Sequence, residues 1–329
     1  MHTKNLIGGE WTGADDGGLF AVHDPATDAL LAEVPDCGEA ETARAIEAAA
    51  SAFESWKAQP AAERSRVLRR LFDLMLCEED RLGELLMREQ GKPKAEAVGE
   101  IRYGASFVEW AAEEAKRIYG ETIPASVPGK RIAVLRQPVG VVAAITPWNF
   151  PCAMITRKIA PALAVGCTAI IKPAEQTPLS ALAFGELCSE AGLPDGVVNI
   201  VTGRDPEPIG RAIFADSRVR HVSFTGSTEV GRILMQQAAG NITRLSLELG
   251  GHAPFIVFED ADLDAAVAGL MASKFRNAGQ TCICANRVFV QQGVYAAFLG
   301  KLTAAVGGLQ LGAGDEAGAQ IGPLIDDAA

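Results

Sequence analysis

The sequence predicts an α/β fold in which helices cover both faces of a doubly wound, parallel sheet. Two observations support this prediction. From residue 139 onward, short apolar runs alternate with longer stretches that start and stop at helix signals, which is typical of strands joined by helices. The first run, 139–145, is apolar throughout, as expected of a strand that is buried on both faces.

Residues 1–125 are predicted to be mostly helical. Apolar residues recur at helical spacing over 46–56 and again over 67–75, so each stretch would present one face to a core. The tripeptide Gly91-Lys92-Pro93 ends the next helix, because it combines a residue without a side chain and a residue without an N–H donor.

The remaining elements are predicted from glycine and proline residues, which mark the ends of helices and strands. Gly192 and Pro194, for example, close the helix before them. Strands are expected at 131–136, 139–145, 168–172, 197–201 and 219–224, and then at 255–258 and 288–291. Helices are expected at 161–166, 178–191, 208–214 and 228–239, then at 262–277 and from 294.

Composition excludes several classes of protein. With 329 residues the chain can bury a large core, and its length suggests two domains. A net charge of −11 argues against nucleic acid or an anionic membrane as a partner. The start has no signal peptide and no stretch reaches the ~20 apolar residues of a membrane helix, so we expect a cytoplasmic protein. Seven cysteines do not suggest a disulfide framework, and four scattered histidines do not suggest a zinc site.

Three motifs carry the chemistry. Cys282 ends the run Phe275-Arg276-Asn277-Ala278-Gly279-Gln280-Thr281-Cys282, a polar turn that presents a thiol. Glu248 precedes Leu249-Gly250-Gly251, and Asn149 lies in Pro147-Trp148-Asn149-Phe150-Pro151. A thiol, a carboxylate base and an amide donor are the groups needed to attack a carbonyl, hold the oxyanion and hydrolyse an acyl-thioester. A lone cysteine is more often buried and inert, but the three motifs together favour catalysis.

With these motifs in this order, the chain resembles the NAD(P)-dependent aldehyde dehydrogenases from about Ile7 almost to its end. The resemblance implies an NAD-binding domain at 1–119 and 141–248, and the N-terminal part of an incomplete α/β catalytic domain at 249–329. It also implies that 120–140 is an oligomerisation segment, although a linker strand fits that sequence equally well. In such enzymes Cys282 would be the nucleophile, Glu248 the base, and Asn149 with the Cys282 N–H the oxyanion site.

The resemblance also assigns a cofactor site. Gly226, Ser227 and Gly231 follow a strand and open a helix, where free N–H groups suit a phosphate, although a structural turn is the alternative. Lys172 and Glu175 would bind the ribose hydroxyls, unless they are merely solvated charges at a helix start. Because a carboxylate repels the extra phosphate of NADP, NAD is favoured and NADP is the second option. The resemblance adds a further set of cofactor residues: Thr146, Pro147, Trp148 and Leu249.

Two arginines indicate the substrate. Arg157 lies on the helix expected after Asn149, and Arg276 lies six residues before Cys282. Singly each is more often a surface residue, but together they would bind a carboxylate at the far end of an aldehyde. The pairing resembles the succinate-semialdehyde dehydrogenase branch of the family. It favours succinate semialdehyde, with glutarate semialdehyde close behind, and disfavours a cationic aldehyde.

Some alternatives stay open at this point. Cys284 is either a packing residue or the partner of Cys282 in a reversible disulfide. Because the chain stops at what looks like the opening turn of a helix, we expect a C-terminally truncated enzyme, which would be a homodimer or homotetramer at full length. The alternatives are a non-catalytic nucleotide-binding or regulatory partner and, less strongly, a thiol esterase that works without hydride transfer.

Overall fold

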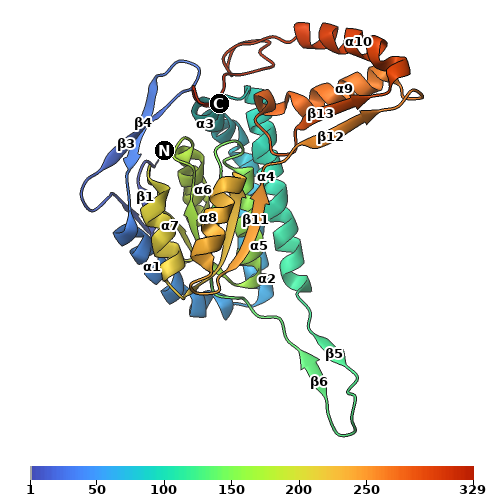
Figure 1. Cartoon of the computed structure of the whole chain (residues 1–329). Coiled ribbons are helices and arrows are strands. Elements are labelled where there is room, and N and C mark those ends of the chain that lie inside the picture. Colours follow the sequence, from blue (N-terminus) through green and yellow to red (C-terminus); the bar gives the residue numbers. More distant parts are fainter. Residues whose placement is uncertain (1) are drawn as a thin grey trace.

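The structure is a computed structural model that describes residues 2–329. A mixed sheet forms the centre of the larger of its two bodies (Figure 1). Within those residues the sheet has seven strands in the order β11-β10-β7-β8-β9-β1-β2. Strands β7 to β11 run parallel, whereas β1 and β2 are antiparallel to their neighbours. The strands are β1 (Asn5–Ile7), β2 (Glu10–Thr12), β7 (Val141–Ile145), β8 (Thr168–Lys172), β9 (Val198–Ile200), β10 (Val219–Gly226) and β11 (Arg244–Leu249).

Helices cover both faces of this sheet, which confirms the doubly wound α/β fold. On one face α1, α7 and α8 enclose a core that includes Ile46, Ile213 and Leu234. On the other face α5 and α6 pack on the strands, with α2, α3 and α4 behind them. These helices are α1 (Glu39–Lys57), α2 (Ala61–Cys77), α3 (Glu79–Gln90), α4 (Lys94–Glu114), α5 (Ala153–Val165), α6 (Pro178–Ala191), α7 (Pro206–Ala215) and α8 (Thr228–Ala238). None of the helices in the described part of the chain is long and apolar enough to cross a membrane.

A smaller α/β body follows β11 and lies beside the larger one (Figure 1). Its own small core is formed by Val257, Val267, Leu270, Ala285 and Phe298. In this body two parallel strands carry two helices. The elements are β12 (Ala253–Val257), α9 (Leu263–Lys274), the 3-10 helix η2 (Arg276–Gly279), β13 (Ala285–Val290), the 3-10 helix η3 (Gln292–Val294) and α10 (Tyr295–Gly307).

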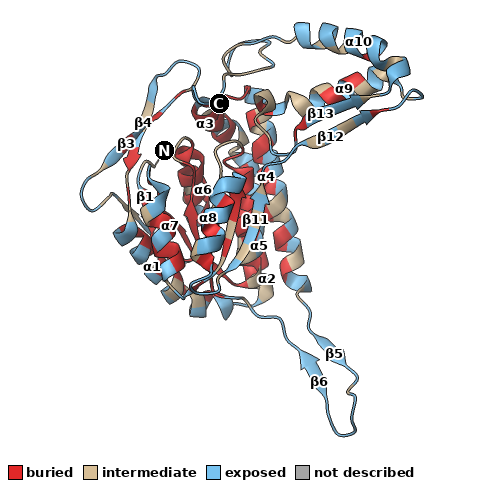
Figure 2. Cartoon of the chain, viewed as in Figure 1, coloured by how far each residue is buried: buried red, intermediate tan, exposed pale blue. Residues whose placement is uncertain are grey.

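Two antiparallel hairpins complete the fold. The pair β3 (Leu19–His23) and β4 (Leu30–Pro35) packs Phe20, Val22 and Val34 into the larger core. The pair β5 (Glu121–Ile123) and β6 (Ile132–Val134) follows the 3-10 helix η1 (Ala115–Arg117) and projects from the body, with every residue of both strands exposed (Figure 2).

Several sequence predictions need correction. The chain up to residue 38 forms strands β1 to β4 rather than helix, because β1 extends the central sheet through the pairing of Leu6 with Ile200. The helix expected at 161–166 begins at Ala153, and Pro161 lies inside it. No helix starts over 324–329, where this described segment forms bends and a short turn.

Candidate active site

The predicted functional residues gather at one edge of the central sheet. Strands β11, β10, β7 and β8 are adjacent and parallel, so their carboxyl ends meet at that edge (Figure 1). Ile145 pairs with Lys172 and with Phe224, and Gly226 pairs with Leu249, which places the four strand ends level with one another. Open α/β sheets bind their ligands at this edge.

The loop that carries Cys282, residues 275–284 and here called the thiol loop, is anchored by hydrogen bonds from Cys284. Cys284 is buried, and its thiol donates to the carbonyl oxygens of Lys274 and Gly279 at 3.3 and 3.4 Å. Asn277 and Ala278 have φ angles of 52° and 55°, so the chain turns there in the left-handed region and the helix predicted over 262–277 ends at Lys274. Cys282 itself is exposed, and within residues 2–329 both cysteines are free thiols.

Asn149 links its own loop to the Cys282 loop. Its Nδ2 donates to the carbonyl oxygen of Gln280 at 2.9 Å, two residues before the thiol. An amide group has two N–H donors, so one remains for a further acceptor. The Oδ1 atom of Asn149 is buried and has no partner in the described part of the chain. The amide therefore lies beside the loop that carries Cys282.

Glu248 reaches the same region from the edge strand β11. It pairs in register with Thr225 of β10, and its side chain is exposed. A Cβ atom added to Gly251 would lie 4.0 Å from the carbonyl oxygen of Cys282, so the loop after Glu248 passes beside the thiol loop. Lys158 of α5 donates to Thr225 Oγ1 at 2.6 Å. Burial lowers the pKa of Lys158 to about 8, with the Arg157 charge acting in the same direction and the Glu248 charge against it.

The expected cofactor residues form a second group at this edge. Lys172 is buried at the end of β8, and its Nζ lies 3.1 Å from Glu175 Oε2. Thr146 donates its backbone N–H to the Lys172 carbonyl oxygen at 3.1 Å, while its buried Oγ1 lacks a partner within residues 2–329. Pro147 and Trp148 are half-buried on the same loop.

The strand-to-helix turn after β10 fits a dinucleotide phosphate. Ser227 accepts from the Val230 N–H at 3.2 Å and so caps α8, whose other first-turn N–H groups remain available. A Cβ atom on Gly231 would lie 2.8 Å from Leu249 Cδ2, and a Cβ atom on Gly226 would collide with the ring of Phe224. The buried Phe224 ring leaves no room for a side chain at Gly226, whereas the neighbour of Gly231 is the movable tip of the Leu249 side chain. These close contacts and the orphaned Thr146 hydroxyl are compatible with a nicotinamide dinucleotide.

The two arginines converge on one aromatic cluster. The Arg157 guanidinium lies 5.6 Å from the centroid of the Phe107 ring. The Arg276 guanidinium lies 4.8 Å from the Phe150 ring and 5.9 Å from the Tyr103 ring. Tyr103 and Phe107 are themselves in edge contact, with centroids 4.7 Å apart. Among the described residues neither arginine forms an ion pair with a carboxylate, so both cations contact this aromatic cluster without a counter-charge.

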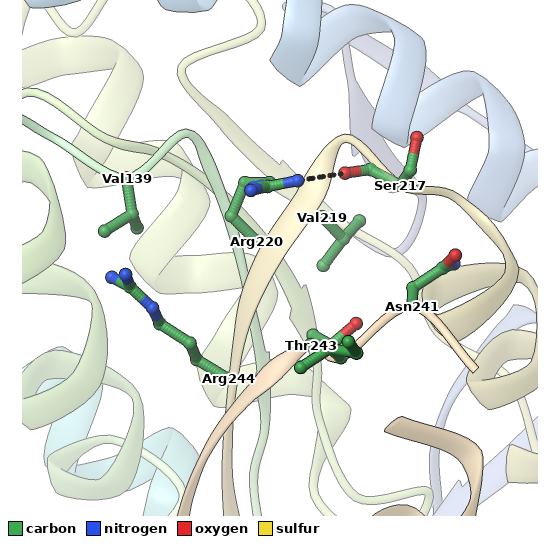
Figure 3. A pocket seen from close by; sticks show the side chains of 8 residues that line it. Val139, Ser217, Val219, Arg220, Asn241, Thr243 and Arg244 are labelled. Atoms are coloured by element: carbon green, nitrogen blue, oxygen red, sulfur yellow. Dashed lines mark hydrogen bonds between the residues drawn. The ribbon is translucent and has the colours of Figure 1, made fainter. Parts of the chain in front are cut away.

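A separate small cavity lies at the opposite, amino-terminal ends of the strands. It has a volume of about 120 Å³ and is lined by residues at the amino ends of β10 and β11, among them Val219 and Arg244 (Figure 3). Arg220 there donates to the carbonyl oxygen of Ser217 at 3.4 Å. The thiol, carboxylate and amide described above lie at the other ends of these strands, so this cavity is no part of their site.

Comparison with known proteins identifies the family. The sequence profile described as the aldehyde dehydrogenase family matches residues 11–329. The chain belongs to the aldehyde dehydrogenase family. Its members are oxidoreductases that act on aldehydes with NAD(P), so this protein is an aldehyde dehydrogenase by descent.

Individual relatives are similar over nearly the whole chain. A glutarate-semialdehyde dehydrogenase of Pseudomonas putida is 59% identical, with 99% of this chain and 68% of that protein covered. A succinate-semialdehyde dehydrogenase of Escherichia coli, named for NADP(+), is 57% identical and covers 100% of this chain and 68% of its own length. The crystal structure of a succinate-semialdehyde dehydrogenase from Burkholderia pseudomallei has a TM-score of 0.98 at 57% identity, covering 99% of this chain and 67% of that one.

Sequence reasoning missed a group of residues beneath the aldehyde dehydrogenase site. Glu96, Glu100, Tyr103 and Phe107 follow one another at intervals of four, three and four on α4, so they share one helix face. Glu96 contacts the thiol loop, and Glu100 contacts the segment that follows Asn149. Tyr103 contacts Arg276, and Phe107 contacts Arg157. A signal was present, because Glu100 interrupts the buried apolar stripe of this helix. A charged residue at a core position needs a specific partner.

Proposed function

We propose that this protein oxidises a carboxylated semialdehyde to the dicarboxylic acid through a thioester at Cys282. Succinate semialdehyde is favoured and glutarate semialdehyde is close. Relatives named for these two substrates support the proposal. The observation that carries it is the pair of cations, Arg157 and Arg276, which contact one aromatic cluster without a carboxylate partner among the described residues.

The first step in this proposal is attack of the Cys282 thiolate on the aldehyde carbon. The carbonyl oxygen becomes an oxyanion, which accepts hydrogen bonds from the second N–H of the Asn149 amide and from the backbone N–H of Cys282. Donors that are already fixed in place stabilise such charge at little reorganisation cost, and losing one raises the barrier by about 3 kcal/mol. The hydrogen bond from Asn149 to Gln280 supports this role, because it fixes the amide beside the loop.

The cofactor would be held by Thr146, Lys172 and the turn at Gly226 and Ser227. When bound, it would supply a nicotinamide ring as the acceptor of the hydride that the tetrahedral adduct loses. The chain's own residues then complete the reaction. Glu248 takes a proton from a water molecule as that water attacks the thioester carbon. The C–S bond then breaks, the acid product is released, and the proton passes from Glu248 to the Cys282 sulfur. The exposure of Glu248 supports this step, since water reaches the carboxylate directly.

We propose NAD as the preferred cofactor, because Glu175 places a carboxylate beside the Lys172 ammonium, where the extra phosphate of NADP would meet like charge. We also propose that residues 1–119 and 141–248 bind this cofactor, and that 249–329 contribute the nucleophile. The ordered strand ends of β7, β8 and β10 support the first assignment, and the position of Cys282 before β13 supports the second.

The substrate proposal is tested by comparing aldehydes that differ in a terminal carboxylate. The reduction of NAD is followed by absorbance with succinate semialdehyde, glutarate semialdehyde and propionaldehyde. We expect the double variant Arg157→Gln/Arg276→Gln to lose about 10–100-fold in kcat/KM for the semialdehydes, since charge-assisted hydrogen bonds at exposed groups are discounted by solvent. For propionaldehyde we expect a change of less than about 3-fold, because no carboxylate is lost.

Cys282→Ala is the control for the chemistry and should retain less than about 1% of wild-type turnover with every aldehyde. An equal loss for semialdehydes and propionaldehyde in the arginine variant would show that the arginines do not select a carboxylate. Turnover by Cys282→Ala near that of the wild type would overturn the thioester itself.

A further inference from the structure

A buried ion pair lies directly behind the loop of Asn149. Lys92 Nζ is 2.6 Å from Glu100 Oε2, and each side chain is only 1% exposed. Removing two charges from water is unfavourable unless further polar contacts satisfy them. An apolar pair of the same volume would fill the space as well, so packing alone does not require these charges. The further hydrogen bonds of Lys92 and Glu100 show what the charges do.

All of these contacts go to the segment that carries Asn149. Lys92 Nζ donates to the backbone carbonyl oxygen of Asn149 at 2.8 Å and lies 4.1 Å from the centroid of the Phe150 ring. The other oxygen of Glu100 accepts from the N–H groups of Cys152 and Ala153 at 3.0 and 3.2 Å. The ion pair therefore holds this segment at Asn149 and again at the start of α5.

Asn277 connects the ion pair to the thiol loop. Its Nδ2 donates to the same Asn149 carbonyl oxygen at 3.0 Å and also lies 3.3 Å from the carbonyl oxygen of Gln280. Its backbone N–H donates to Glu96 Oε2 at 2.8 Å. Because the Asn149 side chain also donates to Gln280, the two loops and their supports form a closed ring of hydrogen bonds.

We propose that Lys92, Glu100 and Asn277 are positioning residues that fix the orientation of the Asn149 amide toward an oxyanion on Cys282. The inference rests on the proposed function, since it concerns the same carbonyl attack. The three side chains act through the Asn149 backbone and leave the reacting atoms to others. Two donors on one carbonyl oxygen prevent the Asn149 peptide from rotating, and a displacement of about 1 Å at such a donor costs about 100-fold in rate.

A double-mutant cycle between Lys92 and Asn149 tests this inference. The variants are Lys92→Met, Asn149→Ala and the combination. Two reactions are measured in each: oxidation of succinate semialdehyde with NAD, and hydrolysis of p-nitrophenyl acetate without cofactor. If Lys92 acts through Asn149, Lys92→Met lowers kcat by about 30–100-fold with little change in KM, yet has less than about a 3-fold effect once Asn149 is alanine.

Arg102→Met is the matched control. Arg102 lies on α4 two residues from Glu100 and also forms an ion pair, but with Glu79 on the exposed side of the helix. It should leave kcat within about 2-fold of the wild type, as expected for a surface pair. If Lys92→Met does not fold, Lys92→Met/Glu100→Gln replaces it, because that variant leaves no lone buried charge.

The outcomes separate this inference from the proposed function. A wild-type chain that hydrolyses the ester through Cys282 but does not oxidise aldehydes would refute the dehydrogenase proposal, and the cycle would still be measured on the ester. Equal losses with and without the Asn149 amide, or no loss from Lys92→Met, would overturn the positioning role alone. A wild type without either activity would overturn both.

Discussion

Lys172 and Glu175 set the electrostatics of the cofactor edge at the scale of single residues. The Lys172 side chain is 4% exposed and the Glu175 side chain is 37% exposed, so the ammonium is fixed and the carboxylate is the part that a ligand meets. One of the carboxylate oxygens is bound to Lys172 at 3.1 Å. The other remains to accept a ribose hydroxyl or to repel a phosphate.

Replacing Glu175 by serine should therefore change the cofactor preference. We expect Glu175→Ser to lower the KM for NADP by about 10-fold, which corresponds to about 1.4 kcal/mol, because Lys172 would face the added phosphate without a competing carboxylate. The KM for NAD should rise a few-fold. Steady-state kinetics with both cofactors measure this, and Glu190→Ser on the exposed side of α6 is the control. An unchanged NADP-to-NAD ratio would show that Glu175 does not set the preference.

The sequence predicts residues that react directly better than residues that act through a long-range contact. Cys282, Glu248 and Asn149 were proposed from their motifs, because reactive groups stand in short, recognisable runs. Lys92 was interpreted only as part of a helix stop, although its ammonium binds the Asn149 carbonyl oxygen. That contact joins residues 57 positions apart. No local pattern predicts it, because it exists only after α4 has packed on α5.

At the scale of elements, helix α6 receives its N-terminal cap from a different helix. Both oxygens of Glu89, near the end of α3, accept backbone N–H groups at the start of α6, from Leu179 and Ser180, at 2.8 Å each. Glu89 is 0% exposed, and burial raises the pKa of its carboxyl group to about 8 against the effect of these hydrogen bonds. The cap is therefore coupled to pH.

We expect this coupling in the free energy of unfolding. Below about pH 4.5 the Glu89 carboxyl group is protonated in both the folded and the unfolded chain. As pH rises toward about 8, the unfolded chain ionises first, so stability falls across this window and levels off above it. Glu89→Gln should lose about 1 kcal/mol at pH 5 through its weaker cap and should lack this contribution to the slope.

Urea unfolding at several values between pH 5 and pH 8 measures the effect, with Glu190→Gln on the same helix α6 as the control. The difference in stability between the wild type and Glu89→Gln should shrink, or reverse in sign, as pH rises. Parallel curves for the two proteins across the whole window would show that Glu89 does not titrate there.

Element boundaries show where local patterns were sufficient. Helix α6 was predicted at 178–191 and is found there, because Pro178 starts it and Gly192, at a φ of 88°, ends it. Helix α5 was predicted to begin at Pro161 and begins at Ala153 instead. Its first turn has no side-chain cap of its own, and the cap comes from Glu100 on α4. A helix start that depends on a distant carboxylate leaves no local signal.

At the scale of the whole molecule, the β5–β6 hairpin is the part least supported by the rest of the chain. It projects from the body, and its apolar side chains Ile123, Ile132 and Val134 are 44%, 41% and 36% exposed (Figure 2). A two-stranded ribbon is marginally stable alone in water. A groove of about 1410 Å³ lies at its base, between the hairpin and the helices α1 and α2. Exposed apolar strands of this kind favour pairing with another chain.

We therefore predict that the hairpin joins copies of this protein into a dimer or tetramer. Burying Ile132 and Val134 against a second copy would remove apolar surface from water, whereas two glutamates there would place four like charges around a two-fold axis. The double variant Ile132→Glu/Val134→Glu should weaken the assembly by at least about 100-fold in dissociation constant, or about 3 kcal/mol. Light scattering coupled to size-exclusion chromatography measures the mass. Val127→Glu, in the exposed turn between the two strands, should leave the mass unchanged. A wild-type chain that is monomeric at micromolar concentration, or a double variant with an unaltered mass, would show that the hairpin makes no such contact.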